Sequence, residues 1–500
     1  MELVKRILTA QVYAVAKHTP LELAPRLSKV LGNQIYLKRE DLQPVFSFKL
    51  RGAFNKIARL SPEERAKGVV AASAGNHAQG VAMAASHFGC EATIFMPTAT
   101  PTIKVEAVRE LGGTIELVGA SFDEANEAAI AHAASESLAF VHPFDDWDVI
   151  AGQGTVGVEI VRQLDGQLDA VFVCVGGGGL VAGVSAYVKA LFPHVKVIGV
   201  EPRDAPTLYM AMEKGEPVDL EHVGLFADGV GVKRIGEHTF AVAREHVDEV
   251  CLVDTDEICA AIKDVFEETR TVLEPSGALG VAGIRKWVRD NGVSGKRLVA
   301  ITSGANMNFD RLRFVAERAE VGLEREALYA VTVPERPGSF RKFVDALEDR
   351  PISEFNYRYD DEDEARLFVG VRVSSREERI AILDRIRSQS MEAVDITDDE
   401  IAKNHVRHMV GGRSSSAHNE CLFAVTFAER PGAFREFLSA TKPAWNISLT
   451  HYRNQGGDVG RVLMGIQIPP DDLDKVGEFI ERAPGVWCEV TNHPSCRFFL

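Results

Sequence analysis

Three kinds of segment in this 500-residue sequence combine residues that could do chemistry together. They are a lysine set among apolar side chains, a run of four glycines, and two turns rich in serine and asparagine. Each lies where a predicted strand gives way to a predicted helix. Because ligands of open α/β sheets bind in crevices at the carboxyl ends of the strands, these segments are candidates for parts of one site.

The lysine is Lys49, in the segment Ser-Phe-Lys-Leu-Arg-Gly-Ala at the entrance to a predicted helix. Phe46, Phe48 and Leu50 are its apolar neighbours in the sequence. An amine in such surroundings is partly desolvated, which lowers its pKa and makes the neutral, nucleophilic form accessible. Schiff-base chemistry with an aldehyde requires that form. A buried lysine held in an ion pair would have the same neighbours, so this segment alone leaves both interpretations open.

The glycine run separates a predicted buried strand at 170–175 from a predicted helix, and consists of Gly176, Gly177, Gly178 and Gly179, followed by Leu180. Residues without side chains let the backbone approach a ligand closely, and the positive end of the following helix favours a phosphate. The run does not have the G-x-G-x-x-G form, and no Walker lysine follows it. A flexible linker is the alternative, but a linker would not connect a buried strand to a helix.

The two polar turns each follow a predicted strand and offer hydroxyl, amide and free N–H groups; they are Ser73-Ala74-Gly75-Asn76-His77 and Ser303-Gly304-Ala305-Asn306. Either turn alone could simply cap a helix. Together with a desolvated lysine and a phosphate cradle, they indicate an aldehyde cofactor with a phosphate tail.

The elements that must position these residues follow an α/β pattern up to about residue 320. Short β-branched apolar runs alternate with alanine-rich helical stretches, and the strands are predicted at 69–73, 92–97, 114–118, 170–175, 195–200 and 297–302. Strands that are apolar on both faces and separated by helices predict parallel sheets covered by helical layers.

Beyond residue 320 the sequence repeats itself. Residues 327–343 align with residues 421–437 at an offset of 94, with 11 of the 17 positions identical, including Glu-Arg-Pro-Gly. Each copy predicts strand, Pro-Gly turn, amphipathic helix, strand, strand, helix and strand over about 75 residues. Two copies make a tandem of small α+β domains rather than a solenoid, and the polar stretch 405–419 is expected to link them.

Composition excludes several classes of protein. The 56 basic and 72 acidic residues give a net charge of −16, which argues against a nucleic-acid or anionic-membrane surface. No apolar run approaches ~18 residues, and the first six residues do not resemble a signal peptide. Seven scattered cysteines predict neither a zinc site nor a disulfide framework, and favour a reducing cytoplasm. The acidic run 360–364 is expected at a hairpin tip, and His405 and His408 as linker polarity rather than a metal pair.

Residues 1 to about 320 resemble the fold-type II pyridoxal-phosphate (PLP) enzymes, the relatives of the tryptophan synthase β subunit. Six segments occur in that family's order: Lys-Arg-Glu-Asp (38–41), Ser-Phe-Lys-Leu-Arg-Gly (47–52), Ser-Ala-Gly-Asn-His-Ala-Gln-Gly (73–80), Gly-Gly-Gly-Gly-Leu (176–180), Glu-Pro-Ser-Gly-Ala (274–278) and Ser-Gly-Ala-Asn (303–306). With the doubled C-terminal module, nearly the whole chain resembles the biosynthetic threonine deaminase (threonine ammonia-lyase) family.

The resemblance implies a role for each matching residue. Lys49 would carry PLP as a Schiff base and act as the catalytic base, Asn76 would hydrogen-bond the phenolic oxygen of the cofactor, and Ser303 would face its pyridine nitrogen. Gly176 to Leu180 would hold the phosphate. Ser73, Asn76 and His77 would bind the substrate carboxylate.

The resemblance also implies a reaction and its control. L-Threonine would lose water and ammonia to give 2-oxobutanoate, the first step of isoleucine biosynthesis, and L-serine would react by the same route. Isoleucine would inhibit and valine activate a cytoplasmic homotetramer. In the similar serine racemases a serine acts as a second base where this chain has Ala74, so we expect little racemisation. The racemases' metal position has Thr207 where an acid would be expected, so no metal is predicted.

The implied domains are a two-lobed catalytic domain at 1–320 with a small lobe inserted at about 41–147, ACT-like regulatory domains at 327–399 and 421–492, and a linker at 400–420. Two alternatives stay open at this point. One is a fold-type II enzyme that replaces the β-substituent of its substrate instead of eliminating it. The other is an inactive amino-acid sensor, against which the intact Lys49, Asn76 and Ser303 argue.

Overall fold

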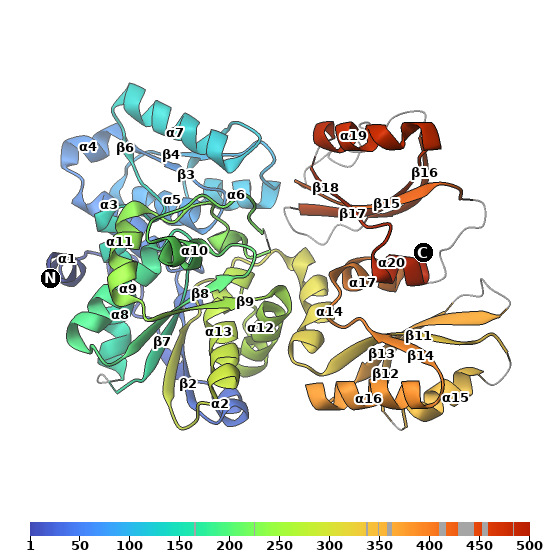
Figure 1. Ribbon diagram of the computed structural model, residues 1–500. Coiled ribbons are helices and arrows are strands. Elements are labelled where there is room, and N and C mark those ends of the chain that lie inside the picture. Colours follow the sequence, from blue (N-terminus) through green and yellow to red (C-terminus); the bar gives the residue numbers. More distant parts are fainter. Residues whose placement is uncertain are drawn as a thin grey trace. The chain divides into compact units, whose positions relative to one another are not determined.

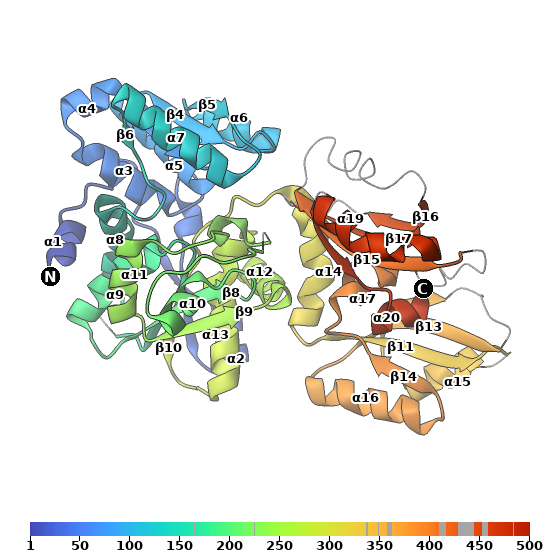
Figure 2. The same cartoon turned by 45° about the horizontal axis from the view of Figure 1, so that its top comes forward.

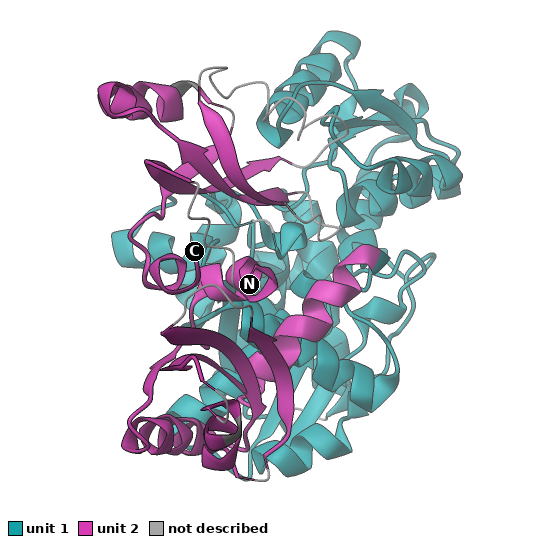
Figure 3. Cartoon of the chain, turned by 90° about the vertical axis from the view of Figure 1, so that its right-hand side faces the viewer, with its two compact units in different colours: residues 1–309 teal, residues 310–500 magenta. Residues whose placement is uncertain are grey.

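The chain forms two compact units, residues 1–309 and 310–500, which Figure 3 distinguishes by colour. This computed structural model describes residues 1–164, 167–224, 226–336, 339–348, 350–357, 363–409, 417–428, 445–452, 459–483 and 485–500. Within them, no helix is long and apolar enough to span a bilayer. The seven cysteines are free thiols.

The larger sheet of the first unit has six strands in the order β1-β2-β10-β7-β8-β9. Figure 1 labels four of them, β2, β7, β8 and β9. Only β1 runs antiparallel to its neighbour; the other pairs are parallel, as predicted. The strands are β1 (Leu21–Leu23), β2 (Gln34–Lys38), β7 (Ala170–Cys174), β8 (Lys196–Pro202), β9 (Glu249–Val253) and β10 (Arg297–Ile301). Its helices are α1 (Glu2–Leu8), α2 (Pro25–Leu31), α8 (Trp147–Gln163), α9 (Gly179–Leu191), α10 (Thr207–Lys214), α11 (Glu237–His246), α12 (Thr255–Thr269) and α13 (Pro275–Asn291).

A second, smaller lobe is inserted between β2 and β7 and contains a four-stranded parallel sheet in the order β5-β4-β3-β6. One apolar core lies between this sheet and α5, and another lies between the sheet and α7 (Figure 1 and Figure 2). The elements are α3 (Lys49–Arg59), α4 (Pro62–Lys67), β3 (Val69–Ala72), α5 (Asn76–Phe88), β4 (Ala92–Met96), α6 (Thr102–Glu110), β5 (Thr114–Leu117), α7 (Phe122–Glu136) and β6 (Ala139–Phe140).

Glycines in α8 and α9 let α8 approach its neighbouring helices to backbone contact. A Cβ added at Gly152 would lie 2.6 Å from the carbonyl oxygen of Arg51 in α3. A Cβ added at Gly183 in α9 would lie 2.5 Å from the carbonyl oxygen of Ile150 in α8. Such distances leave no room for a side chain, so α3 and α9 each pack against α8 at backbone contact.

The second unit contains two four-stranded antiparallel sheets with the same strand order, β12-β13-β11-β14 and β16-β17-β15-β18. Both sheets have a register shift at the corresponding place, between Ile352 and Glu354 and between Ile447 and Leu449. The elements are α14 (Leu312–Gly322), β11 (Glu326–Pro334), α15 (Ser339–Ala346), β12 (Ile352–Tyr357), β13 (Glu364–Arg372), α16 (Arg376–Ser388), β14 (Glu392–Asp395), α17 (Glu400–Asn404), β15 (Glu420–Ala428), β16 (Asn446–Tyr452), β17 (Val459–Gln467), α19 (Val476–Arg482), β18 (Val486–Glu489) and α20 (Pro494–Phe499). The expected tandem of α+β domains is therefore confirmed.

Each repeat has its own core between its sheet and its helices, and a third core joins the two repeats. This shared core takes Leu328, Ala330 and Phe368 from the first sheet, Leu422 and Leu463 from the second, and side chains of α17 and α20. The second unit is thus held together by apolar burial between its repeats.

Two boundaries differ in detail from the expected ones. The units divide at residues 309 and 310, and α14, expected at the end of the catalytic domain, belongs to the second unit. The segment expected as a linker begins with α17, whose Ala402 is buried in the shared core. The glycine-serine part of that linker, both Pro-Gly turns and most of the acidic run 360–364 lie outside the described residues.

Candidate active site

The predicted cofactor residues line a single cavity in the first unit. The cavity is bordered by Lys49, Asn76, Gly176, Gly177, Gly178, Gly179, Leu180 and Ser303, and also by Phe48, Phe144, Cys174, Gly229, Val230, Glu274 and Ser276. These residues come from segments up to 254 positions apart in the sequence, between Lys49 and Ser303. The structure therefore brings together the lysine, the glycine run and one residue of each polar turn.

Backbone hydrogen bonds fix the turn before Lys49 to the turn after β10. The N–H of Phe48 donates to the carbonyl of Ser303 at 3.2 Å, and the N–H of Ala305 donates to the carbonyl of Phe46 at 2.9 Å. Phe46 has a φ of 53°, a left-handed conformation that a bulky residue adopts only when its surroundings impose it. The start of α3 is thus held against the carboxyl end of the larger sheet.

Lys49 is the first residue of α3, and its amine donates to the carbonyl of Pro143 at 2.8 Å. Burial lowers the pKa of this amine to about 8, although the nearby Cys174 and Glu274 act in the opposite direction. A lysine with that pKa exists partly as the free base near neutral pH, as the sequence predicts for a Schiff-base lysine.

The glycine run is closely packed against two other residues that border the cavity. A Cβ added at Gly177 would lie 2.2 Å from the ring of Phe144, and one at Gly176 would lie 2.8 Å from the backbone of Val230. Gly178 has a φ of 91° and is the N-cap of α9, so its conformation also favours glycine. The run ends at the N-terminus of a 13-residue helix, where backbone N–H groups and the helix dipole favour an anion.

The two polar turns contact each other through amide side chains. Asn306 donates to the side-chain oxygen of Asn76 at 2.6 Å, and Asn76 donates to Glu274 at 2.6 Å. Ser303 is buried, and its hydroxyl donates to the carbonyl of Ser276 at 3.3 Å. Asn76 is therefore held by Asn306 and Glu274, with its side chain at the edge of the cavity.

Ser73 and His77 lie at the same end of α5 as Asn76 but do not line this cavity. The Ser73 hydroxyl accepts a hydrogen bond from the N–H of Gly75 at 3.2 Å. His77 is buried, with Nε2 2.8 Å from the carbonyl oxygen of Val141. Burial lowers the pKa of His77 to about 3, so the ring is neutral and its Nε2 donates to that carbonyl. Their assignment to the substrate carboxylate stays a prediction.

The cavity fits a phosphate-bearing aldehyde such as PLP. It offers an amine of lowered pKa at one place and a side-chain-free loop at a helix N-terminus at another. The hydroxyl of Ser276 is buried at the cavity and has no hydrogen-bond partner among the described residues, although a buried polar group without a partner is costly. Lys49 would hold the aldehyde carbon, the glycine run the phosphate, and Ser303 the ring nitrogen.

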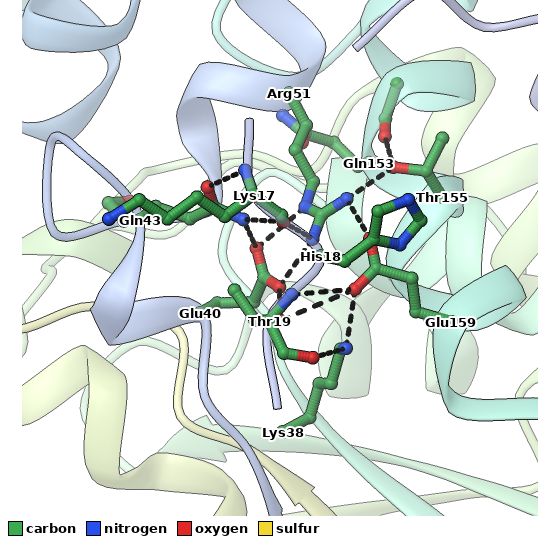
Figure 4. Close-up of polar contacts among 12 residues, drawn as sticks. Lys17, His18, Thr19, Lys38, Glu40, Gln43, Arg51, Gln153, Thr155 and Glu159 are labelled. Carbon is green, nitrogen blue, oxygen red and sulfur yellow. Dashed lines mark hydrogen bonds and ion pairs between the residues drawn. The ribbon is translucent and has the colours of Figure 1, made fainter. Parts of the chain in front are cut away.

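A buried ion network is centred on Arg51, two residues after Lys49 in α3, and also includes Glu40, Glu159 and Lys38 (Figure 4). Arg51 contacts Glu40 and Glu159 at 2.7 Å each, and Lys38 contacts Glu159 at 2.6 Å. All four side chains are at most 3% exposed. Because Arg51 is in α3, Glu159 in α8, and Lys38 and Glu40 at the end of β2, the network ties the lysine-bearing helix to the larger lobe.

The structure adds residues that the sequence alone does not assign to the site, among them Glu274, Phe144 and Pro143. Glu274 belongs to one of the six family segments, and its position directly before Pro275 at the start of α13 is a signal in the sequence. Phe144 and the Pro143 carbonyl come from an irregular stretch after β6 that has no distinctive spacing. Their positions follow from the tertiary fold alone.

Comparison with known proteins agrees with these features. The model of the pyridoxal-phosphate-dependent enzyme family matches residues 13–304, and the C-terminal regulatory domain of threonine dehydratase matches residues 317–406 and 411–500.

Several relatives are similar over almost the whole chain. The chain is 51% identical to the biosynthetic L-threonine dehydratase IlvA of Pasteurella multocida, covering 100% of this chain and 97% of that protein. It is 51% identical over 489 residues to a chloroplastic biosynthetic threonine dehydratase of Solanum lycopersicum, covering 98% of this chain and 80% of that protein.

Among solved structures, the processed form of threonine deaminase isoform 2 from Solanum lycopersicum is 50% identical with a TM-score of 0.63, covering 64% of this chain and 92% of that one. Serine racemase from Dictyostelium discoideum is 34% identical with a TM-score of 0.57, covering 61% of this chain and 99% of that one.

We predict that Lys49 reacts with an acylating reagent at unusually low pH in the cofactor-free, full-length protein. Its rate should rise with the free-base fraction and reach half of its maximum near pH 8, whereas ordinary lysines do so at about pH 10.4. Glu274→Gln removes a negative charge that raises the Lys49 pKa, so the plateau should begin at lower pH. Peptide mass spectrometry across a pH series measures both. Half-maximal reaction of Lys49 only at about pH 10.4 would contradict the prediction.

We predict that Arg51→Met destabilises the first unit by about 3–5 kcal/mol, because it leaves the buried Glu40 and Glu159 without their shared cation. Arg59→Met is the matched control in the same helix, since Arg59 is partly exposed and its loss should cost under about 1 kcal/mol. Denaturant unfolding of the full-length chain, followed by a probe in the first unit, compares the two. Equal free energies of unfolding for both variants would refute the role given to the network.

Proposed function

This chain belongs to the biosynthetic threonine dehydratases, which are PLP-dependent lyases, and from that premise we propose how its residues divide the work. The reaction is the deamination of L-threonine to 2-oxobutanoate and ammonia by elimination of water, in isoleucine biosynthesis. The observation that carries the proposal is that Lys49, Asn76, the glycine run and Ser303 border one cavity.

The amine of Lys49 first binds the cofactor and later takes the α-proton of the substrate. Its pKa of about 8 supports both roles, because the free base is available near neutral pH and its conjugate acid can return a proton. The chemistry that bound PLP supplies is an electron sink, which makes that α-proton acidic. Lys49 stands at the edge of the cavity bordered by the glycine run, which supports placing the amine beside the reacting carbon.

The other residues bind and orient. The N–H groups at the start of α9 hold the phosphate, and the side chain of Asn76, itself fixed by Asn306, faces the phenolic oxygen. Ser303 would offer the ring nitrogen of bound PLP a neutral hydroxyl, which, unlike a carboxylate, would not keep that nitrogen protonated and so would favour prompt loss of the β-hydroxyl. Ser73, Asn76 and His77 bind the substrate carboxylate at the N-terminus of α5, where the helix dipole is favourable.

L-Serine fits the same scheme, since it differs from threonine by one methyl group, and we propose it as a second substrate. Racemisation should be weak, because the methyl group of Ala74 cannot exchange a proton on the opposite face of the substrate.

We also propose that the two C-terminal domains bind the effectors, isoleucine as inhibitor and valine as activator, in a cytoplasmic homotetramer. The match of both repeats to a regulatory domain supports effector binding. The choice of these amino acids and the tetramer rest on the family resemblance.

The test of the catalytic proposal is the formation of 2-oxobutanoate from L-threonine by the wild type, Lys49→Ala and Lys49→Arg. Both variants should lose at least about 10³-fold in kcat, because neither can supply the free amine. Borohydride reduction of the wild-type holoenzyme should attach the cofactor to Lys49. Turnover by Lys49→Ala comparable to wild type would refute the assignment. Efficient formation of a new amino acid from an added thiol would instead favour a β-replacing enzyme.

The test of regulation is the steady-state rate with L-threonine in the presence of isoleucine, valine or both. Isoleucine should raise the threonine concentration needed for half-maximal rate, and valine should reverse the shift. A chain ending at residue 309 removes the whole second unit and should lose both responses if it folds and stays active. Inhibition by isoleucine in that truncated chain would place the effector site in the first unit.

A further inference from the structure

Two buried threonine hydroxyls hold consecutive carbonyl groups of the glycine run from outside the cavity. Thr207, the first residue of α10, has its hydroxyl 2.8 Å from the carbonyl oxygen of Gly176. Thr239, in the first turn of α11, has its hydroxyl 2.6 Å from the carbonyl oxygen of Gly177. Both threonines are fully buried, and neither lines the cavity.

Each contact also determines the direction of an N–H group. In a planar trans peptide the C=O of one residue and the N–H of the next point in opposite directions. When the Gly176 carbonyl is drawn to Thr207, the N–H of Gly177 is turned the other way. The same argument applies to the Gly177 carbonyl, Thr239 and the N–H of Gly178. Gly177 and Gly178 border the cavity, whereas the two threonines do not. The N–H groups of these two glycines, which point away from the threonines, are therefore turned toward the cavity.

Both threonines are themselves firmly held. The buried carboxyl of Glu201 accepts hydrogen bonds from the N–H groups of Leu208 and Tyr209 and lies 2.9 Å from the Thr207 hydroxyl, which fixes the first turn of α10. Burial raises the pKa of Glu201 to about 7, so near neutral pH a large fraction keeps its proton. A protonated Glu201 can donate to Thr207 and leave the threonine's own hydrogen for Gly176.

On the other side, the Asp145 carboxylate accepts hydrogen bonds from the N–H groups of Glu237, His238 and Thr239 at 2.9–3.1 Å. This cap fixes the first turn of α11 and with it the Thr239 hydroxyl. The two tethers thus come from different helices, each anchored by its own carboxyl group.

We propose that Thr207 and Thr239 are positioning residues that aim the N–H groups of the glycine run at the cofactor phosphate. They act on the phosphate alone and touch neither the ring nor the aldehyde. The proposal rests on the glycine run being the phosphate site. It goes beyond that assignment because it names the groups that give the run its geometry.

The experiment compares PLP with pyridoxal, which has the same ring and aldehyde but no phosphate. Dissociation constants of both are measured by absorbance titration of the cofactor-free, full-length chain. Thr207→Val and Thr239→Val should each weaken PLP binding about tenfold, the loss that goes with one buried hydrogen bond, and leave pyridoxal binding within about twofold. Thr207→Ser and Thr239→Ser keep the hydroxyl and should bind PLP like the wild type.

Thr397→Val is the matched control, because Thr397 is an equally buried threonine in the second unit and its hydroxyl bonds the backbone of Leu328. It should change neither constant. The phosphorus NMR shift of the bound cofactor gives a second measurement and should move only in the valine variants. Unchanged PLP binding in both valine variants, or an equal loss for pyridoxal, would overturn the proposal. A wild type that binds PLP no more tightly than pyridoxal would instead refute the phosphate site itself.

Discussion

The position of Lys49 depends on a guanidinium group that has no contact with solvent. Arg51 lies between the carboxylates of Glu40 and Glu159, and each of these belongs to a different part of the larger lobe. Placing such charges in the interior is costly unless they are paired and hydrogen-bonded on all sides, and this geometry meets that requirement. The network therefore holds the first turn of α3 against Glu40 and Glu159. The reactive amine, two residues earlier, inherits that placement.

Other functional groups around the cavity are also held in place by hydrogen bonds to neighbouring residues. Asn76 is held by Asn306 and Glu274, and the turn before Lys49 is hydrogen-bonded to the turn that carries Ser303. The groups that would meet a ligand are few, while the groups that orient them are spread over both lobes. This division explains why the lobes are connected by backbone-to-backbone helix contacts, since a shift of α8 would move several of these supports together.

Much of this arrangement could be predicted from the sequence because local patterns determine it. The apolar runs of the sequence predict the buried strands before the glycine run and before both polar turns. Strands β7 and β10 are neighbours in the larger sheet, whereas β3 belongs to the sheet of the smaller lobe. The repeat in the second unit was readable from identity alone. The parts that escaped prediction depend on tertiary contacts: Phe144 packs on Gly177 from an irregular loop, and Thr207 reaches Gly176 from a helix 31 positions away. The helix α17 lies in the segment expected as a linker, and its five residues are too few to show a helical period in the sequence.

The shared core of the second unit has a consequence for the independence of its two repeats. Each repeat packs one face of its sheet against its own helices. The other face contributes to the core shared with the other repeat, through residues such as Leu328, Phe368 and Leu463. Separating the two repeats would expose that apolar face to water, so neither repeat is a free-standing module. Each repeat thus depends on the other for the burial of the apolar face of its sheet.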